Sequence, residues 1–597
     1  MKRILANRNF IWADAFINQL CDLGVRYACI SPGSRNTPLV SVLAKNKKVK
    51  CFVHIDERVS GFFALGIAKA IKLPVIVVTT SGTATSELYP AIIEAYQQRI
   101  PLLICTADRP PELLNTGANQ TINQWNLYRN HIRWFKNVGI PELSSNRINF
   151  IKKIAVKAFD ISLFHEMGPV HLNFPFRKPL DKNSFTDEVD IELIDEAKKP
   201  IQIQSNDQKV NEIAKREIKQ IDSIYKKLIK YSKGLIIVGP MNYDDIFIKN
   251  VKALARITNY PILADGVSHL RFAYSNSDKF VCSNYDAFLR SGKFKVKHNP
   301  EIILQFGRTP TSVFLQNYID ETKPSQFIAN KFGDMVYPSV KGSTIIKIEP
   351  NQFCEKIIER LQKTKSKKKN NIWNNDFKKA DELLENLRIK LIKNSDVKIE
   401  PIIIPTVLSC IPSNTNIMLG NSLPIRDFEW FVDKTEKSYQ VYFNRGASGI
   451  DGITSTALGI ASIKKPTILI TGDLSFIHDL NALLPAGKYS IPLLVILINN
   501  NGGGIFSMLP VLSKNKFFTD YFITPHNLNI SEIVKSFRLK HHTIKSCEDL
   551  KKKIKTSIRD KSFTVLEIKT NGNDSMKFRK NYWASAVKKI DKEFTDK

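Results

Sequence analysis

Short apolar runs alternate with longer amphipathic stretches along most of the chain. The runs are rich in Val, Ile and Leu, and turn-forming Gly, Ser, Thr, Asn or Asp residues follow them. Continuous apolar runs of strand length are typical of parallel strands that helices cover on both faces. We therefore predict an α/β fold with doubly wound, mainly parallel sheets. The predicted strands are residues 27–30, 75–78, 102–105, 235–238, 302–305, 417–419, 467–471 and 493–498.

Two polar stretches interrupt this alternation and are predicted to be linkers. They cover residues 181–217 and residues 363–375, the second with a Lys-Ser-Lys-Lys-Lys core. A chain of 597 residues is too long for one ordinary domain. Division at the linkers gives three α/β domains of ordinary length, at about residues 1–190, 200–360 and 375–597.

The charge of the chain raises the question of an acidic partner. Lys and Arg number 88 against 57 Asp and Glu, which gives a formal net charge of +31. Such a charge suits nucleic acid, an anionic membrane or acidic small molecules. The basic residues are mostly scattered lysines, however, without the interleaved aromatic residues of a nucleic-acid surface. We therefore expect no nucleic acid and no membrane as partner, and the longest apolar runs are far shorter than the roughly 20 residues of a membrane span.

The cysteines and the first residues of the chain predict a cytoplasmic protein. The eight cysteines form no Cys-x-x-Cys pair, so reduced thiols are expected. The first residues, MKRILANRNFIWADAF, lack the apolar core and the cleavage site of a signal peptide.

A pair of strand ends in the last third of the chain is the strongest candidate site. One predicted strand ends in Gly472-Asp473, and the other ends in Asn499-Asn500-Asn501-Gly502. In a doubly wound sheet, ligands bind at the carboxyl ends of the strands. The Asp473 carboxylate, the Asn500 amide oxygen and the Gly502 carbonyl are hard oxygen ligands that suit Mg²⁺ beside a diphosphate.

This spacing resembles the thiamine-diphosphate motif of the decarboxylase and acetolactate-synthase superfamily. The superfamily pattern begins Gly-Asp-Gly, whereas this chain continues from Asp473 with Leu474-Ser475. Such enzymes need a glutamate from another domain that bonds to N1′ of the aminopyrimidine and activates the cofactor. Glu57, before a Gly- and Ala-rich helix expected at 60–69, is our candidate. A glutamate at a helix start is otherwise explained by the helix dipole.

Four arginines in strand-end loops indicate an anionic substrate. Arg35, Arg109, Arg426 and Arg445 each follow a predicted strand. The planar fork of arginine suits bidentate carboxylate binding. One such arginine is usually a structural ion pair, but four beside a candidate cofactor site predict substrates with several carboxylates.

Together these segments resemble the 2-succinyl-5-enolpyruvyl-6-hydroxy-3-cyclohexene-1-carboxylate (SEPHCHC) synthase family. The resemblance implies decarboxylation of 2-oxoglutarate and 1,4-addition of the succinic semialdehyde unit to isochorismate, with thiamine diphosphate and Mg²⁺ or Mn²⁺, in menaquinone or phylloquinone biosynthesis. The matching stretches are SPGSRNTPL (31–39), DERVSGFFALGIAK (56–69), TSGTATSELYPAIIEA (80–95), TADRPPEL (106–113), GANQTINQ (117–124), GNSLPIRD (420–427), NRGASGIDGITSTALG (444–459), GDLSFIHDLNALL (472–484) and NNNGGGIFSMLP (499–510).

The resemblance also implies a role for each matching residue. Glu57 becomes the cofactor activator, Ile450 the apolar support of the bent cofactor, and Ser475 a further cofactor contact. Asp473, Asn500 and Gly502 become the metal ligands. The implied substrate-binding residues are Ser34, Arg35, Arg109, Gln120, Ser422, Arg426, Arg445, Ile505 and Phe506, of which all but Ser34, Ile505 and Phe506 are also candidate catalytic residues.

Other readings of some residues stay open. Many relatives have a basic residue at the position of Val313, so a substrate contact from the middle domain would need Arg308 or a nearby lysine instead. Structural or supporting roles are expected for His478 and His526 rather than proton transfer. Another thiamine-diphosphate decarboxylase or carboligase, such as acetolactate synthase, is the alternative enzyme. The resemblance also implies a homodimer or homotetramer with the active site at the subunit interface.

Overall fold

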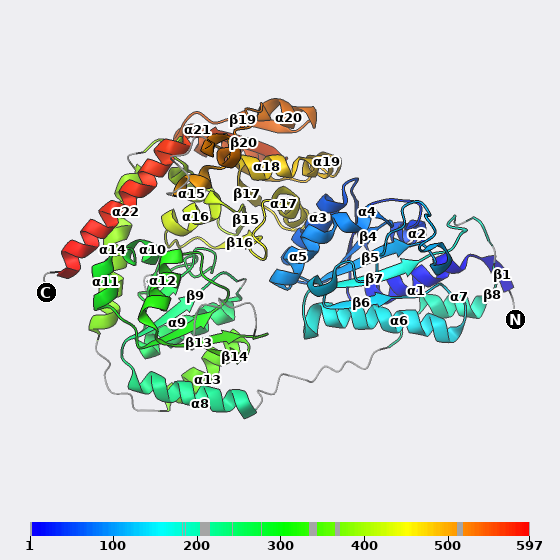
Figure 1. The fold of residues 1–597 in the computed structure, drawn as a ribbon, viewed down its shortest axis with the longest axis horizontal. Helices are drawn as coiled ribbons and strands as arrows, with labels where there is room; N and C mark the ends of the chain where they lie inside the picture. The colour runs from blue at the N-terminus through cyan, green and yellow to red at the C-terminus, as the bar shows by residue number, and fades with distance from the viewer. Residues whose placement is uncertain are drawn as a thin grey trace.

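The chain forms three six-stranded sheets, one after another along the sequence (Figure 1). This computed structural model describes residues 3–595 except 182, 186, 203–214, 242, 276–277, 334–342, 364–370, 394 and 510–516. All strand pairs described within the three sheets are parallel. The predicted α/β fold with doubly wound, mainly parallel sheets is confirmed.

The N-terminal sheet has the strand order β3-β2-β4-β5-β7-β6. Its strands are β2 (Tyr27–Ile30), β3 (Lys50–Val53), β4 (Val75–Thr79), β5 (Leu102–Asp108), β6 (Trp134–Asn137) and β7 (Pro169–Pro175). The helices around it are α1 (Arg8–Asp22), α2 (Thr37–Lys45), α3 (Glu57–Ile71), α4 (Thr83–Glu87), α5 (Tyr89–Gln98) and α6 (Ser145–Asp160). Every residue of β4 and β5 is buried, as the continuous apolar runs predict.

The middle sheet has the order β11-β10-β9-β12-β13-β14. Its strands are β9 (Gly234–Val238), β10 (Ile262–Ala264), β11 (Val281–Cys282), β12 (Ile302–Phe306), β13 (Ser325–Asn330) and β14 (Thr344–Lys347). Its helices are α8 (Lys215–Lys230), α9 (Asp245–Thr258), α10 (Tyr285–Phe288), α11 (Gly292–Lys297), α12 (Val313–Thr322) and α13 (Pro350–Gln362).

The C-terminal sheet has the order β16-β15-β17-β18-β20-β19. Its strands are β15 (Thr415–Leu419), β16 (Tyr439–Phe443), β17 (Thr467–Gly472), β18 (Leu494–Asn499), β19 (Lys540–Thr543) and β20 (Thr564–Lys569). Its helices are α15 (Glu400–Cys410), α16 (Leu423–Phe431), α17 (Ile453–Ala461), α18 (Asp473–His478), α19 (Leu483–Lys488), α20 (Ile530–Ser536), α21 (Cys547–Asp560) and α22 (Gly572–Thr595). The preceding helix α14 (Ile372–Lys393) packs against α10 and β11 of the middle unit and against α22. In Figure 1, α22 runs beside α14 at the edge of the molecule, in agreement with the contact of these two helices.

The linker predictions are wrong in part. Within the first predicted linker, β8 (Asp187–Asp190) pairs antiparallel with β1 (Arg3–Ala6), and α7 (Ile191–Lys198) packs against α1. Leu193, Ile194 and Ala197 of α7 supply the apolar contact with the N-terminal core. Residues 203–214 of the first linker and 364–370 of the second lie outside the described residues.

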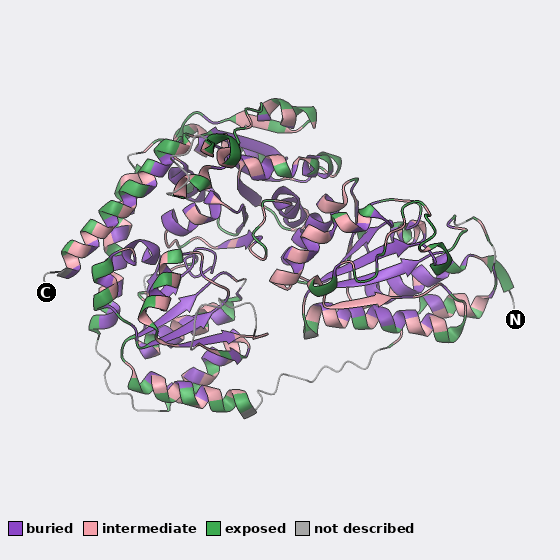
Figure 2. Cartoon of the chain, viewed as in Figure 1, coloured by how far each residue is buried: buried purple, intermediate pink, exposed green. Residues whose placement is uncertain are grey.

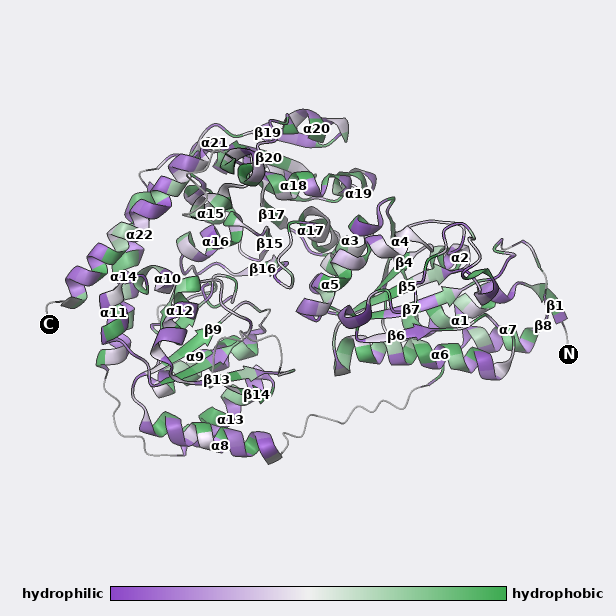
Figure 3. Cartoon of the chain, viewed as in Figure 1, coloured by the Kyte–Doolittle hydropathy of each residue, from purple (hydrophilic) through white to green (hydrophobic). Residues whose placement is uncertain are grey.

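Burial follows the layered arrangement of the three units. The sheets are buried at the centre of each unit, whereas the helices alternate between buried and exposed faces (Figure 2). The hydropathy of the chain shows the same division, with hydrophobic strands and mixed helices (Figure 3). Among the described residues, no helix is both long enough and apolar enough to cross a membrane.

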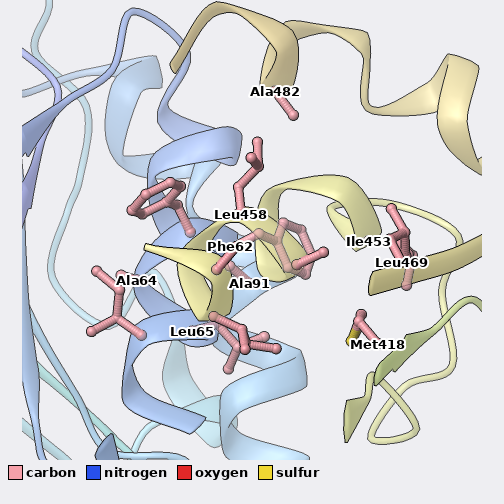
Figure 4. Close-up of a cluster of buried hydrophobic side chains, with 14 of the residues drawn as sticks. Phe62, Ala64, Leu65, Ala91, Met418, Ile453, Leu458, Leu469 and Ala482 are labelled. Carbon is pink, nitrogen blue, oxygen red and sulfur yellow. The ribbon is translucent and has the colours of Figure 1, made fainter. Parts of the chain in front are cut away.

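A shared hydrophobic cluster joins the N-terminal and C-terminal units. Figure 4 shows Phe62, Leu65 and Ala91 of the first unit beside Ile453 and Leu458 of the second. Helices α3 and α17 cross at glycines. A Cβ on Gly66 would lie 2.1 Å from the carbonyl oxygen of Thr456, and one on Gly459 would lie 2.1 Å from that of Phe63. The two helix backbones therefore pack in direct contact.

A buried ion pair joins the middle unit to the C-terminal unit. Arg271 follows β10, and its Nη2 donates to Glu429 Oε1 of α16 at 2.8 Å. The guanidinium also donates to the carbonyl oxygens of Ala264, Glu429 and Val432. Helix α16, which carries Arg426, is therefore fixed from the middle unit as well as from its own sheet.

Candidate active site

Two neighbouring strand ends of the C-terminal sheet carry the candidate metal ligands. The β17–β18 register runs from Ile468–Leu494 to Gly472–Ile498, so Asp473 and Asn500 follow adjacent strand ends. Asp473 is buried, and its Oδ2 accepts a hydrogen bond of 2.9 Å from the Gly502 amide. The structure thus brings all three candidate ligands together at two neighbouring strand ends.

The Asn500 side chain shows that these residues fit a divalent cation. Its Nδ2 donates to Glu400 Oε1 at 2.7 Å, whereas its buried Oδ1 has no hydrogen-bond partner among the described residues. A buried polar atom without a partner costs free energy that a bound ligand can recover. Carboxylate, amide and carbonyl oxygens are the ligands that Mg²⁺ and Mn²⁺ prefer.

The backbone conformation at position 502 requires a glycine. Its φ is +143°, and a Cβ there would lie 2.2 Å from the carbonyl oxygen of Ile523. Any other residue would therefore displace the neighbouring segment or the carbonyl of Gly502 itself.

His526 is brought against the Asp473 carboxylate. Its Nε2 lies 3.3 Å from Asp473 Oδ2. Burial raises the pKa of Asp473, while hydrogen bonds from the Leu474 and Gly502 amides and from His526 act in the opposite direction. His526 thus supports a candidate ligand, whereas His478 is exposed at the end of α18.

Glu57 begins α3, whose N-cap Asp56 accepts a hydrogen bond from the Val59 amide at 3.2 Å. Partial burial raises the pKa of Glu57, and the charges of Asp56 and Glu87 raise it further. The adjacent Arg58 donates to the carbonyl oxygen of His478 at 3.2 Å, and His478 ends the short helix that Asp473 begins. Glu57 is therefore adjacent in sequence to a residue that contacts α18, the helix that begins at Asp473.

Apolar candidate residues are accessible beside these loops. Ile450 is 38% exposed between β16 and α17, and its carbonyl oxygen accepts a hydrogen bond of 2.9 Å from Ser475 Oγ of α18. Ser475 therefore fixes the loop that carries Ile450. Ile505 and Phe506 lie in a short 3₁₀ helix (Gly504–Met508), where Phe506 is exposed and its ring lies 5.6 Å from that of Phe522.

The first pair of candidate arginines lies in the N-terminal unit. Arg35 Nη1 donates to the Phe176 carbonyl oxygen at 2.7 Å, and Arg109 donates to Ser81 Oγ and to the Asn119 carbonyl oxygen. Burial lowers the pKa of both guanidinium groups, and their mutual repulsion adds to the effect at Arg35. The nearby Asp108 carboxylate acts in the opposite direction on both arginines. The pair has one more positive charge than negative with Asp108 included, which favours an additional anion.

Two further substrate candidates lie beside this pair and are exposed. Ser34 directly precedes Arg35, and Gln120 follows Asn119, the acceptor of Arg109. Gln120 has a positive φ of 55°. A Cβ on Gly82 would lie 3.2 Å from the Gln120 carbonyl oxygen, so the two loops are in contact.

The second pair of candidate arginines lies in the C-terminal unit. Arg426 Nη1 donates to the carbonyl oxygen of Ser422, which precedes α16 and has a φ of +69°. Burial lowers the pKa of Arg426 and Arg445, and the charge of Arg445 lowers that of Arg426 further. The four predicted arginines thus form two pairs, one in the N-terminal unit and one in the C-terminal unit.

Three side chains of the N-terminal unit bind the loop that carries Arg445. We call Lys69, Glu94 and Gln98 the loop clamp. Glu94 accepts hydrogen bonds of 2.8 and 2.7 Å from the amides of Gly446 and Ala447. Lys69 Nζ donates to the Phe443 carbonyl oxygen and to Asn444 Oδ1, and Gln98 Nε2 donates to the same carbonyl.

The middle unit contributes no basic side chain at position 313. Ser312 caps α12 and donates to Asp286 Oδ1 at 2.5 Å, while Val313 is 59% exposed. Arg308, the predicted substitute, donates to the carbonyl oxygen of Gln97 in α5. This bond directs Arg308 toward the N-terminal unit.

Comparison with known proteins identifies cofactor-binding domains in both outer units. Residues 12–127 match the family described as thiamine pyrophosphate enzyme, N-terminal TPP binding domain. Residues 432–568 match the corresponding C-terminal TPP binding domain.

Curated SEPHCHC synthases are similar to the chain along nearly its whole length. The enzyme of Bacillus cytotoxicus is 35% identical over 581 residues, which cover 96% of each chain. That of Listeria monocytogenes serotype 4b is 34% identical over 97% of this chain and 98% of its own. That of Haloquadratum walsbyi is 33% identical over 98% and 99%, respectively.

This chain belongs to the SEPHCHC synthase family. The resemblance predicted from the motifs is therefore confirmed, and the alternative of another thiamine-diphosphate carboligase is not favoured. In this SEPHCHC synthase family member, the N-terminal TPP-domain match contains Glu57. The C-terminal match contains Arg445, Asp473 and Asn500.

Sequence reasoning missed the residues of this SEPHCHC synthase family member that hold the candidate ligands in place. They are the loop clamp and the buried Glu400, Asp427 and Arg579, which contact one another. Their partners are distant along the chain, for example 100 residues between Glu400 and Asn500. The available signal was that Lys69, Glu94 and Asp427 lie inside the matching stretches 56–69, 80–95 and 420–427.

Proposed function

We propose that this protein catalyses the thiamine-diphosphate-dependent synthesis of SEPHCHC. It decarboxylates 2-oxoglutarate and transfers the succinic semialdehyde unit to isochorismate, with release of CO₂. The observation that carries the proposal is the sequence identity of 33–35% to curated SEPHCHC synthases along almost the entire chain. The product is a precursor in menaquinone or phylloquinone biosynthesis.

The proposed cofactor contacts come from residues of the N-terminal and C-terminal units. Thiamine diphosphate, when bound, supplies the electron sink for the decarboxylation. Asp473 and Asn500, with the Gly502 carbonyl, hold Mg²⁺ or Mn²⁺ beside the diphosphate. Glu57 would bind the ring nitrogen N1′ of the aminopyrimidine. Partial burial raises the pKa of this carboxyl. Ile450 supports the cofactor with its exposed side chain, and Ser475 holds the loop of Ile450.

The two arginine pairs bind the substrate carboxylates. 2-Oxoglutarate carries two carboxylates and isochorismate carries two, so the proposed reaction brings several negative charges into one site. Charge-assisted bonds from the arginines fix the orientation of both substrates. Ser34, Gln120 and Ser422 add hydrogen bonds, and Ile505 and Phe506 form an apolar wall of the site.

For the assembly we propose a homodimer or homotetramer with the active site at the subunit interface. The protein acts in the cytoplasm on small molecules, without nucleic acid or membrane as partner.

One assay tests the proposed reaction. Purified protein with thiamine diphosphate, Mg²⁺, 2-oxoglutarate and isochorismate is expected to consume isochorismate, which is followed by its absorbance. Omission of 2-oxoglutarate or its replacement by pyruvate should abolish the loss of absorbance. Turnover of pyruvate without turnover of this pair would instead identify an acetolactate-synthase-like enzyme.

A further inference from the structure

A buried carboxylate directly contacts the candidate metal ligand Asn500. Glu400 is the first residue of α15 and is 1% exposed. Its Oε1 accepts hydrogen bonds from Asn500 Nδ2 at 2.7 Å and from Thr570 Oγ1 at 3.2 Å. Its Oε2 accepts one from Arg579 Nη2 of α22 at 2.6 Å. Both oxygens of Glu400 are thus held by donors.

This contact decides which atom of the Asn500 amide faces the cation site. A carboxylate only accepts hydrogen bonds, whereas an amide has a donor nitrogen and an acceptor oxygen. With Nδ2 on Glu400, Oδ1 is directed away from it, into the buried position without a partner among the described residues. The flipped amide would place Oδ1 against Glu400 Oε1, and two acceptors in contact repel each other. Glu400 therefore selects the amide orientation that offers oxygen to a metal.

Arg579 prevents Glu400 from turning away. Its Nε donates to Asp427 Oδ1 at 2.8 Å while its Nη2 reaches Glu400, and the whole guanidinium is buried. The charges of Asp427 and Glu400 overcome the effect of burial and raise the pKa of Arg579. The resulting buried network joins α15, α16 and α22 behind the metal-ligand loop.

We propose that Glu400 is a positioning residue for the divalent cation, which orients Asn500 and is itself fixed by Arg579. The proposal rests on the proposed function only through the cation site. Loss of a side chain that orients a metal ligand by a hydrogen bond typically lowers metal affinity about 10- to 100-fold.

The test measures metal binding without either substrate. Mn²⁺ is titrated into the protein with thiamine diphosphate, and free Mn²⁺ is followed by its electron paramagnetic resonance signal. Glu400→Gln is expected to raise the Kd for Mn²⁺ about 10- to 100-fold, because a glutamine can satisfy Arg579 or Asn500 but not both. Saturating Mn²⁺ should restore much of the lost turnover, so that the metal requirement changes more than kcat.

Asp427→Asn is the matched control. It removes a second buried carboxylate from the same arginine but touches no metal ligand, so the Kd for Mn²⁺ should stay within about threefold. Circular dichroism and thermal melting report the folding of both variants. Equal Kd values for Glu400→Gln and the wild type, or equal shifts for the two variants, would overturn the proposal.

A second variant keeps the test valid if Glu400→Gln does not fold. Asn500→Asp supplies a charged ligand, which by ligand chemistry alone should bind Mn²⁺ at least as tightly as asparagine. Facing Glu400, it is instead expected to bind more weakly, and Glu400→Gln in the same chain should restore affinity. Tighter binding by Asn500→Asp alone would contradict the proposed contact. Failure of the wild type to bind Mn²⁺ would overturn the cation site as well, whereas a wrong substrate assignment leaves these results unchanged.

Discussion

At the scale of single residues, Glu57 is the first residue of α3, and its carboxyl group has a raised pKa. We predict that Glu57→Gln lowers kcat by about 10²- to 10⁴-fold, the usual contribution of a positioned proton-transfer group. Glutamine keeps the size and polarity of the side chain, so the circular dichroism spectrum should not change. Glu548→Gln on the exposed face of α21 is the control, and it should leave kcat unchanged. If Glu57→Gln retained most of its activity, its assignment as activator would be wrong.

The two arginine pairs give a second prediction at this scale. Arg445→Ala should lower kcat/KM for the substrate pair by about 10- to 100-fold, because it removes a charge-assisted bond from a half-buried position. Arg559→Ala, which removes an exposed arginine from α21, serves as the matched control and should change kcat/KM less than twofold. Similar losses in the two variants would show that Arg445 does not bind substrate.

The sequence was sufficient to predict that the candidate metal ligands lie at neighbouring strand ends. Asp473 and Asn500 follow apolar runs, and parallel strands align their carboxyl ends, so proximity followed from the pattern. Glu400 and Arg579 could not be found in this way. Their bond spans 179 residues, and a glutamate at a helix start and an arginine on a long helix are each ordinary alone. Only the folded chain shows that both are buried.

At the scale of elements, the crossing of α3 and α17 depends on Gly66 and Gly459. Gly66→Ala is expected to destabilise the protein by about 1–3 kcal/mol, because its Cβ meets the backbone of α17 rather than a movable side chain. A lower melting temperature would show this. Gly292→Ala, at a glycine with open space around it, should not lower the melting temperature. Unchanged melting of Gly66→Ala would contradict the close contact.

The strands with continuous apolar runs were predictable, because such runs bounded by turns leave few alternatives to buried parallel strands. Other strands of the three sheets, such as β3, β13 and β19, were not among the predicted ranges. A further strand that was not predicted lies in the first predicted linker. The strand β8 is Asp-Glu-Val-Asp and is mostly polar. It pairs antiparallel with β1, and Arg3 Nε lies 3.1 Å from Asp190 Oδ1 across the pair. A short polar strand at an edge has no hydrophobic period that a sequence pattern could reveal.

At the scale of the whole molecule, the loop clamp makes stability depend on pH. Burial lowers the pKa of Lys69 to about 7, with Arg308 acting in the same direction and Glu94 opposing. Between pH 7 and about 10.5 the unfolded chain keeps a proton that the folded chain has released, so stability rises with pH. Relative to Lys69→Met, the wild type should gain up to about 1.4 kcal/mol per pH unit in this range. Urea unfolding of both proteins at pH 7, 8 and 9 measures this difference, and a constant difference would contradict it.

The proposed assembly predicts complementation between inactive variants. Glu57→Gln and Asp473→Asn, unfolded and refolded together, should regain up to about a quarter of wild-type activity if each site takes Glu57 from one subunit and Asp473 from another. Half of the randomly mixed dimers are then hybrids, and each hybrid has one intact site of two. No recovery would instead place both halves of the site in one chain, where α3 and α17 already meet.

The bond from Arg579 to Asp427 and Glu400 also sets an order of events during protein synthesis. The ribosome makes the two acids 152 and 179 residues before their shared cation. Until Arg579 has left the ribosome, the nascent chain cannot bury both carboxylates without a large free-energy cost. The N-terminal and middle units can complete their folding earlier, as nascent domains generally do. We therefore expect the C-terminal unit to mature last, and the metal-ligand loop to gain its final arrangement only when α22 docks.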